Sequence, residues 1–523
     1  MRPRHPEGHL SAKTIHLSTR TALAVALTVL GLGSTVGLAN AQEGQPSSWP
    51  QYQGGPGHAG SLEDGPQPPF RERWRRPAPA GESLSPAILV DGLAVTVGSE
   101  AVYGVDLGTG TVLWELPRAG GPLSTPAAGS VGGSTVVLYL EGPQDEAEPS
   151  PSASATTSVS TSGSPSPGGG AGGLGEGGEA LSSLVAVSLE NRTELWRIPL
   201  EGVARSGVTI DGTIAYVGDQ DGHVVAVALS DGSVIWSAEV PGRVDVPVAV
   251  SGDTAYVVAR DADPPSVAIV ALDTSTQLDE GTDRERWKVF PQATSTVGSA
   301  LAAGEGFVLV GSADRLLRSI AAEDGTERWA SLVLSFFSPA TAPAFAGDAV
   351  YGVDLSGGLY RFDAAEGHRE WSHQLNEVVF RSAPVVSGPT VLLGLSDGRL
   401  VAIDAASGHL VWGSEATPGL VGTIALGPDI VVAVKGGKDA GLIAFEPDPQ
   451  GTLVDLPSPT ELDAGTTLSR YAVAAAVVVV GALVPGMLLR RRFGPADLSG
   501  DIDGEDLGET EDEDSAETDE EGP

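Results

Sequence analysis

The sequence predicts an all-β protein made of repeated units, an eight-bladed β-propeller with four-stranded antiparallel blades. Seven of the nine tryptophans end the same short phrase. The intervals between these tryptophans are 82, 40, 51, 42, 42 and 41 residues, and a period near 40 is typical of propellers. The chain has 70 glycines and little of the three- and four-residue apolar spacing that a helical repeat needs.

Each phrase is interpreted as a strand, a tight turn and a second strand that carries the tryptophan. In VYGVDLGTGTVLW, which ends at Trp114, an apolar run precedes the turn. The turns at 106–110, 363–367 and 404–408 begin with Asp, which can bond backbone amides, and end with Gly, which accepts positive φ. Two more apolar runs precede each phrase, so a repeat supplies the four strands of one blade.

The position of the tryptophan favours a packing role, because a large flat side chain can fill the wedge between adjacent sheets. We therefore expect no repeat tryptophan to belong to a binding site. The intervals from Trp74 to Trp412 give seven units, and residues 413–457 supply an eighth unit without a closing tryptophan. Trp74, in FRERW, is predicted to supply the missing fourth strand, which closes the ring and removes open sheet edges. Seven blades are the alternative if the unit around Trp196 or Trp287 is merged.

The repeat G-x-L-x-A-[IVF]-D-x-x-[ST]-G-x-x-x-W resembles the PQQ-like β-propeller repeat of quinoprotein alcohol dehydrogenases and of the outer-membrane assembly lipoprotein BamB. The segment WPQYQGGPGHAG, residues 49–60, is similar to the lead-in found in that group. The resemblance covers about residues 47–457. It implies the fold but not the activity, since one fold hosts many functions.

The resemblance to quinoprotein dehydrogenases would imply a vicinal cysteine disulfide, a tryptophan stacked on the cofactor PQQ, and a Glu/Asn/Asp calcium site with a catalytic Asp. The chain has no cysteine, and no stretch between the blades matches the calcium-site pattern. We therefore assign no catalytic, cofactor-binding or metal-binding residue, expect no cofactor, and expect that the protein is not an enzyme. A PQQ-dependent oxidoreductase with an atypical site is the alternative.

The eight histidines are interpreted as ordinary surface residues. His58 lies in the lead-in, His223 starts a strand and His373 follows a repeat tryptophan. None of them accompanies a cysteine or a spaced set of acids that would indicate a metal or acid–base site. The other histidines are His5, His9, His16, His368 and His409.

Both ends of the chain carry segments that are not part of the propeller. Residues 1–41 have the basic start, apolar stretch and small-x-small end of a signal peptide, with an uncleaved anchor as the alternative. Residues 471–489 carry no charge, and three arginines follow them. This pattern predicts one transmembrane helix with a cytoplasmic C-terminus and the repeats outside. The predicted layout is signal peptide 1–41, propeller 42–460, transmembrane helix 471–489 and acidic disordered cytoplasmic tail 490–523.

Two low-complexity segments are predicted to be disordered. Residues 142–180 are rich in Ser, Pro and Gly, and they explain the 82-residue interval. Because the segment contains Ser and Thr with interspersed Pro, it is also a candidate for O-glycosylation. Residues 497–521 contain 14 acidic residues and no basic one, as expected for an extended solvated tail.

The charge balance narrows the function classes. Of the 68 acidic residues, 14 lie in the tail and one in the signal region, and of the 30 basic residues, four lie in the signal region and three follow the span, so the exported part is near −30. Such a surface repels nucleic acid. We expect a monomeric, single-pass cell-membrane protein whose extracytoplasmic propeller binds an envelope protein or a cell-wall component. A receptor that senses a ligand and signals through the acidic tail is a further alternative.

Overall fold

The computed structural model describes residues 49–453 except 80–81, 143–181, 263–264, 279–281, 293–298, 339–340, 376, 380 and 438. The chain divides into two units, 1–47 and 48–523, and the described residues all belong to the second. The predicted signal peptide, membrane span and acidic tail therefore lie outside the described residues, as does nearly all of the 142–180 insertion. Among the described residues, no helix is both long and apolar enough to cross a membrane.

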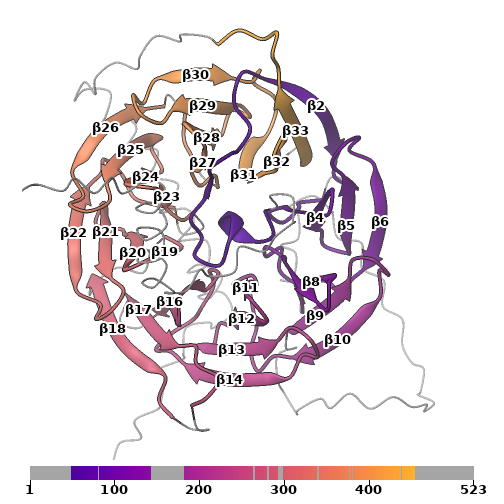
Figure 1. Ribbon diagram of the computed structural model, residues 1–523, viewed down its shortest axis with the longest axis vertical. Helices are drawn as coiled ribbons and strands as arrows, with labels where there is room; N and C mark the ends of the chain where they lie inside the picture. Colours follow the sequence, from indigo (N-terminus) through magenta and orange to yellow (C-terminus); the bar gives the residue numbers. More distant parts are fainter. Residues whose placement is uncertain are drawn as a thin grey trace, which may run out of the picture. The chain divides into compact units, whose positions relative to one another are not determined.

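Eight small sheets surround a central axis as the blades of a propeller (Figure 1), which confirms the predicted number of blades. Blade 1 contains β3 (Ile88–Val90), β4 (Leu93–Val97), β5 (Ala101–Asp106) and β6 (Val112–Pro117). Blade 2 contains β7 (Ala127–Val131), β8 (Ser134–Glu141), β9 (Ser183–Ser188) and β10 (Glu194–Pro199). Blade 3 contains β11 (Thr209–Asp211), β12 (Ile214–Gly218), β13 (His223–Ala228) and β14 (Val234–Glu239). Blade 4 contains β15 (Ala249–Ser251), β16 (Thr254–Ala262), β17 (Pro265–Asp273) and β18 (Glu285–Gln292).

The second half of the ring repeats this pattern. Blade 5 contains β19 (Ala302–Gly304), β20 (Phe307–Gly311), β21 (Leu316–Ala321) and β22 (Glu327–Leu332). Blade 6 contains β23 (Ala344–Ala346), β24 (Ala349–Val353), β25 (Gly358–Asp363) and β26 (Arg369–Gln374). Blade 7 contains β27 (Val385–Ser387), β28 (Thr390–Gly394), β29 (Leu400–Asp404) and β30 (Leu410–Gly413). Blade 8 contains β31 (Leu420–Leu426), β32 (Val431–Gly436), β33 (Gly441–Pro447) and, from the start of the chain, β2 (Phe70–Pro77).

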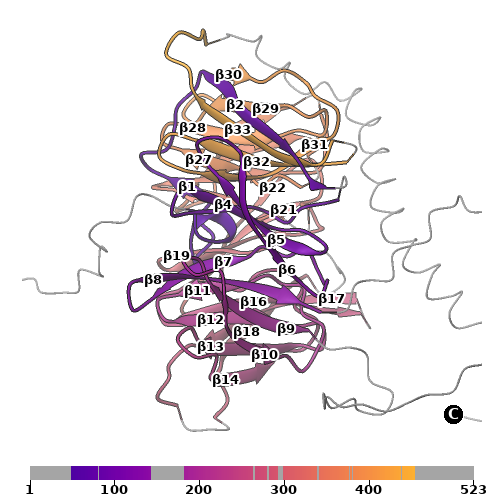
Figure 2. The same ribbon diagram turned by 90° about the vertical axis from the view of Figure 1, so that its right-hand side faces the viewer.

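Blade 8 closes the ring without a covalent turn. Strand β2 pairs antiparallel with β33, and Trp74 lies opposite Ala444. Figure 2 shows the two strands side by side. Just beyond the last residue pair of this ladder, Phe70 and Pro447, the Asp448 backbone N–H donates to the Pro69 carbonyl at 2.7 Å. The predicted closure through FRERW is therefore confirmed.

The repeat tryptophans pack between neighbouring blades. The Trp74 indole N–H donates to the Leu107 carbonyl at 2.8 Å, beside the predicted turn that ends at Gly110. Gly110 has φ 69°, and a Cβ on it would lie 2.7 Å from the indole of Trp74. This glycine is needed both for the turn and for the close approach of the indole. Four other junctions repeat the indole donation: Trp196 to Leu229, Trp287 to Ala322, Trp329 to Ala364 and Trp371 to Ala405.

Two glycines of blade 6 allow the effect of the positive φ and the effect of the indole contact to be measured separately. Gly367 (φ 71°) would place a Cβ 2.4 Å from the Trp329 indole, whereas Gly347 (φ 58°) has no atom within 4 Å of such a Cβ. Both alanine variants carry the positive-φ cost, but only Gly367→Ala overpacks the junction, at about 1–3 kcal/mol more. Urea unfolding of both variants measures the difference. Equal losses would show that the indole contact does not constrain Gly367.

The lead-in runs inside the ring and fills its centre (Figure 1). It contains the short 3₁₀ helix η1 (Tyr52–Gly54) and the two-residue strand β1 (Ser61–Leu62). Trp49 exchanges two backbone hydrogen bonds with Leu89 of blade 1. Further lead-in carbonyls accept backbone N–H groups from first strands: Pro50 from Ala128, Pro56 from Val250, Gly57 from Ala303, Ala59 from Phe345 and Gly60 from Val386.

The innermost strand of a blade has a free edge, and the lead-in forms hydrogen bonds with that edge in blades 1 to 7 in turn. In blade 3, the side-chain amide of Gln51 does so, since it accepts the Ile210 N–H at 2.7 Å and donates to the Ile210 carbonyl at 2.9 Å. In blade 7, β1 pairs parallel with β27. That sheet therefore has five strands rather than the predicted four, because the lead-in supplies the extra one.

Candidate functional site

The lead-in places polar side chains on the propeller axis and satisfies them internally. The Tyr52 hydroxyl accepts the Ala342 N–H at 3.0 Å. His58 Nδ1 lies 3.1 Å from the Leu301 carbonyl, and its Nε2 lies 3.4 Å from the Thr209 hydroxyl. The rings of Tyr52 and His58 meet edge to face, with centroids 5.1 Å apart.

The interpretation of the histidines as surface residues was wrong for two of them. His58 is 0% exposed and His373 is 6% exposed. No apolar pattern surrounds His58 in the sequence, because its burial comes from the surrounding blades and not from its own segment. His373 is buried because it lies on β26, on the side that faces the next blade.

Burial makes His58 a source of acid sensitivity. Desolvation, only partly offset by the hydrogen bond with Leu301, lowers its pKa to about 4. Because the unfolded value is near 6.5, the unfolded chain binds the proton first, and His58 removes about 3 kcal/mol of stability as pH falls from about 6.5 to about 4. Asparagine suits the φ of 57° at this position, so His58→Asn should fold and lose less stability over this range. Denaturant unfolding at several pH values measures both slopes, and parallel slopes would contradict the prediction.

A hollow between the lead-in and blades 1, 2, 7 and 8 is nearly filled. Lead-in residues 49 and 51–53 form its floor. The hollow has a volume of about 10 Å³, which is room for roughly one water molecule. A tricyclic quinone needs a pocket of several hundred Å³, so PQQ, which the resemblance to quinoprotein dehydrogenases implies, does not fit in this hollow. The walls are Pro86, Ala87, Thr125, Ala383, Thr423 and Ile424.

A cluster of potential metal ligands lies on the turn before β13. One ligand atom each of Asp219, Asp221 and His223 lies within 4.8 Å of the others. His223 Nδ1 is 2.9 Å from an Asp219 oxygen, and although burial lowers the pKa of His223, this hydrogen bond and the Asp219 charge raise it above the usual value. The expectation that no histidine accompanies a spaced set of acids was therefore wrong for His223.

The same turn recurs elsewhere in the ring, which favours a structural role for the cluster. Asp219 accepts the backbone N–H groups of Asp221 and His223, both at 2.9 Å. In blade 6, Asp354 accepts those of Ser356 and Gly358, also at 2.9 Å. The carboxylate at this position is a turn-forming group, so the cluster is not assigned to a metal.

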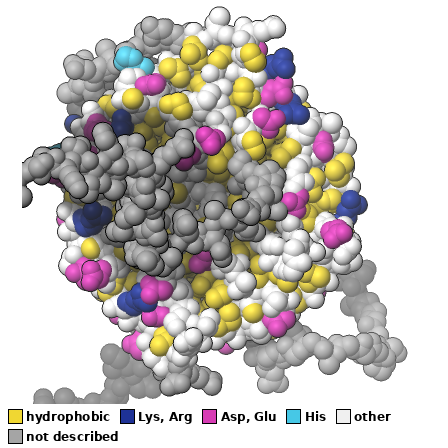
Figure 3. All heavy atoms as spheres, in the orientation of Figure 1, with side chains coloured by type: hydrophobic (Ala, Val, Ile, Leu, Met, Phe, Trp, Pro, Cys, Tyr) yellow, Lys and Arg dark blue, Asp and Glu magenta, His cyan; other side chains and the backbone are white. Residues whose placement is uncertain are grey.

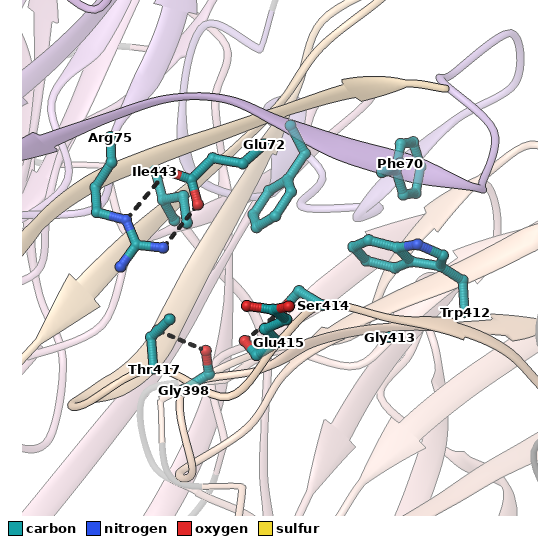
Figure 4. A pocket seen from close by; sticks show the side chains of 11 residues that line it. Phe70, Glu72, Arg75, Gly398, Trp412, Gly413, Ser414, Glu415, Thr417 and Ile443 are labelled. Carbon is teal, nitrogen blue, oxygen red and sulfur yellow. Dashed lines mark hydrogen bonds and ion pairs between the residues drawn. The ribbon is translucent and has the colours of Figure 1, made fainter. Parts of the chain in front are cut away.

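An open pocket of about 290 Å³ lies between blades 7 and 8, where the ring closes (Figure 4). Its apolar wall is aromatic: Trp412 meets Phe70 and Phe445 edge to face, at centroid distances of 5.2 and 5.8 Å. Trp412 thus packs between blades and also lines a pocket. The other lining residues are Glu72, Arg75, Gly398, Gly413, Ser414, Glu415, Thr417 and Ile443.

Beside the pocket, blade 7 carries one extra residue after its repeat tryptophan. In five blades, the residue four places after the repeat tryptophan is buried, and its N–H donates at 2.8 Å to the carbonyl of the residue before the third strand. In blade 7 the residue four places after Trp412 is the exposed Ala416, and the next residue, Thr417, takes the equivalent place. A Cβ on Gly398 would meet the Thr417 carbonyl as one on Gly222 would meet that of Val240. The buried residues at this place in the five blades are Arg118, Leu200, Val240, Val333 and Leu375.

The rim of the pocket is polar. Arg75 donates two hydrogen bonds to Glu72, at 3.2 and 2.7 Å, and these bonds raise the pKa of Arg75. Glu415 is exposed and forms no ion pair among the described residues. The Thr417 hydroxyl donates to the Gly398 carbonyl at 3.1 Å. Figure 4 shows the Glu72–Arg75 pair on one side and Glu415 with Thr417 on the other.

A buried lysine holds this rim in place. Lys435 is 2% exposed, and its ammonium donates to the Thr417 hydroxyl at 2.7 Å and to the Pro418 carbonyl at 2.9 Å. Burial lowers the pKa of Lys435. The segment that leaves β30 early is therefore fixed to blade 8, and the pocket is part of the folded ring.

On the face shown in Figure 3, the charged side chains are dispersed and do not gather in one region. Acidic side chains are spread around the rim, and several lie beside a basic one. The described part of this face that is visible has no broad patch of one sign. Recognition on this visible part would therefore depend on shape and local contacts more than on a uniform field.

The geometry defines a closed eight-bladed propeller with a filled axis, and comparison with known proteins assigns its family. The family model described as outer membrane protein assembly factor BamB matches residues 181–277 and 274–423. The chain belongs to the PQQ-like β-propeller family and its propeller is BamB-like. No curated protein matches the chain in sequence.

Solved structures share the fold at low sequence identity. A europium-containing methanol dehydrogenase matches with a TM-score of 0.56 at 12% identity, over 77% of this chain and 98% of that one. Quinohemoprotein alcohol dehydrogenase ADHIIG from Pseudomonas putida HK5 matches with 0.55 at 12% identity, over 81% and 84%. The computationally designed protein Ika8 matches with 0.51 at 15% identity, over 77% and 100%. These likenesses concern the fold alone, since they join enzymes and a designed protein.

Proposed function

We propose that the protein is a non-enzymatic interaction scaffold of the cell envelope, with its propeller outside the cytoplasm and a membrane anchor at 471–489. The observation that carries the proposal is the filled axis: the chain's own lead-in occupies the centre of the ring, so the propeller offers its surfaces to a ligand. The match to the BamB family model supports the same conclusion. The signal-like start and the uncharged 19-residue stretch support the location.

The test is cross-linking in cells that express the full chain. A photoreactive residue is placed at Glu415, on the rim of the open pocket, or at Leu113, which is 49% exposed on β6. A scaffold should give a discrete cross-linked product from at least one of these positions. The matched internal control carries the photoreactive residue in place of His58, which is 0% exposed, and should give no cross-linked product.

A second measurement addresses the enzymatic alternative. The purified full chain is incubated with PQQ and calcium, and both a bound chromophore and dye reduction with alcohols are monitored. The proposal expects neither, because the axial hollow holds only about 10 Å³. Dye reduction together with no cross-linked product would overturn the scaffold proposal.

A further inference from the structure

We propose that Asn191, in the turn between β9 and β10 of blade 2, is an acceptor for an N-linked glycan. The sequence Asn191-Arg192-Thr193 has the form Asn-x-Ser/Thr, with x other than Pro, that N-glycosylating enzymes recognise. The chain has three asparagines, and only this one is followed two places later by Ser or Thr. The inference rests on the proposed location of the propeller outside the cytoplasm, and it adds a modified site to the proposed function.

The tip of this turn is accessible from outside the ring. Strand β10 is the outermost strand of blade 2 (Figure 1). Residues 190–195 are all exposed, so the three residues of the pattern are open to an enzyme. In the turns of the same form in blades 1, 3, 5, 6 and 7, the residue at the Arg192 position is a buried glycine. The turn of blade 2 is therefore the more accessible one.

Arg192 also keeps the turn away from the neighbouring tryptophan. In blade 3, a Cβ on Gly232 would lie 2.8 Å from the indole of Trp196. Arg192, with φ 58°, carries a real Cβ, so its turn cannot pack as closely against an indole. Five other repeat tryptophans donate their indole N–H to the next blade, whereas Trp114 makes no such bond to the described residues of blade 2. The tip of the turn is thus not held by blade 1.

The two side chains that an enzyme would bind are not engaged in the turn. Asn191 donates its backbone N–H to the Ser188 hydroxyl at 3.2 Å, but neither its side chain nor that of Thr193 has a hydrogen-bond partner among the described residues. In blade 5, Asp324 occupies the Asn191 position and accepts both the backbone N–H and the hydroxyl of Thr326, at 3.0 and 2.7 Å. Such local bonds withhold both groups. In blade 2 an enzyme can take hold of the amide and the hydroxyl without opening the turn.

The reaction transfers an oligosaccharide from a polyprenyl pyrophosphate lipid to the amide of Asn191. Its Nδ2 attacks the anomeric carbon of the first sugar, and an N–C bond forms. The bond between that carbon and the phosphate oxygen breaks, the lipid pyrophosphate leaves, and one amide proton passes to a base of the transferring enzyme. The Thr193 hydroxyl is the group by which that enzyme recognises the acceptor.

The test is the mass of the full chain purified from the cells that make it. The native chain should exceed Asn191→Gln by the mass of one oligosaccharide, and peptide mass spectrometry should place the sugar on residue 191. Thr193→Ala should also remove the sugar, whereas Thr193→Ser, which keeps the hydroxyl, should retain it. All three variants should fold, because these side chains form no hydrogen bond with any described residue.

Asp324→Asn, made in the Asn191→Gln background, is the matched control. It completes the same pattern with Gly325 and Thr326 at the equivalent turn of blade 5. There the side-chain oxygen at 324 still accepts from Thr326, and a Cβ on Gly325 would lie 2.8 Å from the indole of the preceding blade. The folded chain should receive no sugar at this turn. Equal transfer to both turns would overturn the inference, because the free turn of blade 2 would then not select the site.

A native chain without the extra mass, or a sugar that survives Asn191→Gln, would also overturn the inference. The proposed location fails separately. The chain has no cysteine, so Leu113→Cys offers a single exposed site for a membrane-impermeant maleimide in intact cells. Labelling of this site in a chain that carries no sugar would keep the location and reject Asn191 as an acceptor. Absence of both the label and the sugar would reject the location itself.

Discussion

Replacing Trp74 with alanine is expected to cost about 3–5 kcal/mol of unfolding free energy, the range for removing a buried tryptophan. Trp74 is 8% exposed, and its indole donates to Leu107 while it packs against Gly110. It lies on the only strand of blade 8 that comes from the other end of the chain. Its loss therefore weakens both the junction with blade 1 and the closure of the ring.

The control for Trp74→Ala is Leu113→Ala on the neighbouring β6. Leu113 is 49% exposed, so its truncation should change stability by about 0.5 kcal/mol or less. Urea unfolding, followed by far-UV circular dichroism, measures both variants. A loss for Trp74→Ala no larger than that for Leu113→Ala would mean that the closing strand does not depend on this side chain.

Replacing Gly57 with alanine is expected to displace the lead-in from the axis and to cost about 2–4 kcal/mol, from overpacking and from lost hydrogen bonds. A Cβ on Gly57 would lie 2.4 Å from the Ala303 carbonyl oxygen. No side-chain rotation can relieve a contact with backbone. The Gly57 carbonyl also accepts the Ala303 N–H at 2.7 Å, and a shift of the lead-in would break this bond.

Gly55, two residues away, is the matched control. A Cβ there would have no atom within 4 Å, and its φ of −162° is extended backbone that alanine adopts readily. Gly55→Ala should therefore be neutral, or stabilising by about 0.4–1 kcal/mol through the unfolded state. Urea unfolding compares the two, and limited proteolysis should cut the lead-in only in Gly57→Ala. Similar behaviour of both variants would show that the lead-in does not hold the axis.

The repeat architecture could be predicted from the sequence because each of its determinants is local. The tryptophan period sets the number of blades, and the Asp-to-Gly turns mark the hairpins between the third and fourth strands. Closure through Trp74 was predictable as well, because one end of the chain had a strand to spare and the other end lacked one. These features follow from neighbouring residues and from counting.

The path of the lead-in could not be predicted, because its partners are single residues on seven different blades. The burial of His58 and the pairing of β1 follow from that path. The open pocket could not be predicted either, because blade 7 carries one extra residue between Trp412 and Thr417. The extra residue is recognised only once the structure shows where Val240 and its equivalents lie in the other junctions.

Closure by β2 also determines when this protein can finish folding. The pairing joins Phe70 to Pro447, so an early segment must wait for almost the whole propeller to be synthesised before it finds its partner. Long-range pairing of this kind is slow, and unpaired strands are prone to aggregate in the interval. A chain that stops short of the final repeat would leave FRERWRRP without its partner strand, as an open sheet edge that favours aggregation.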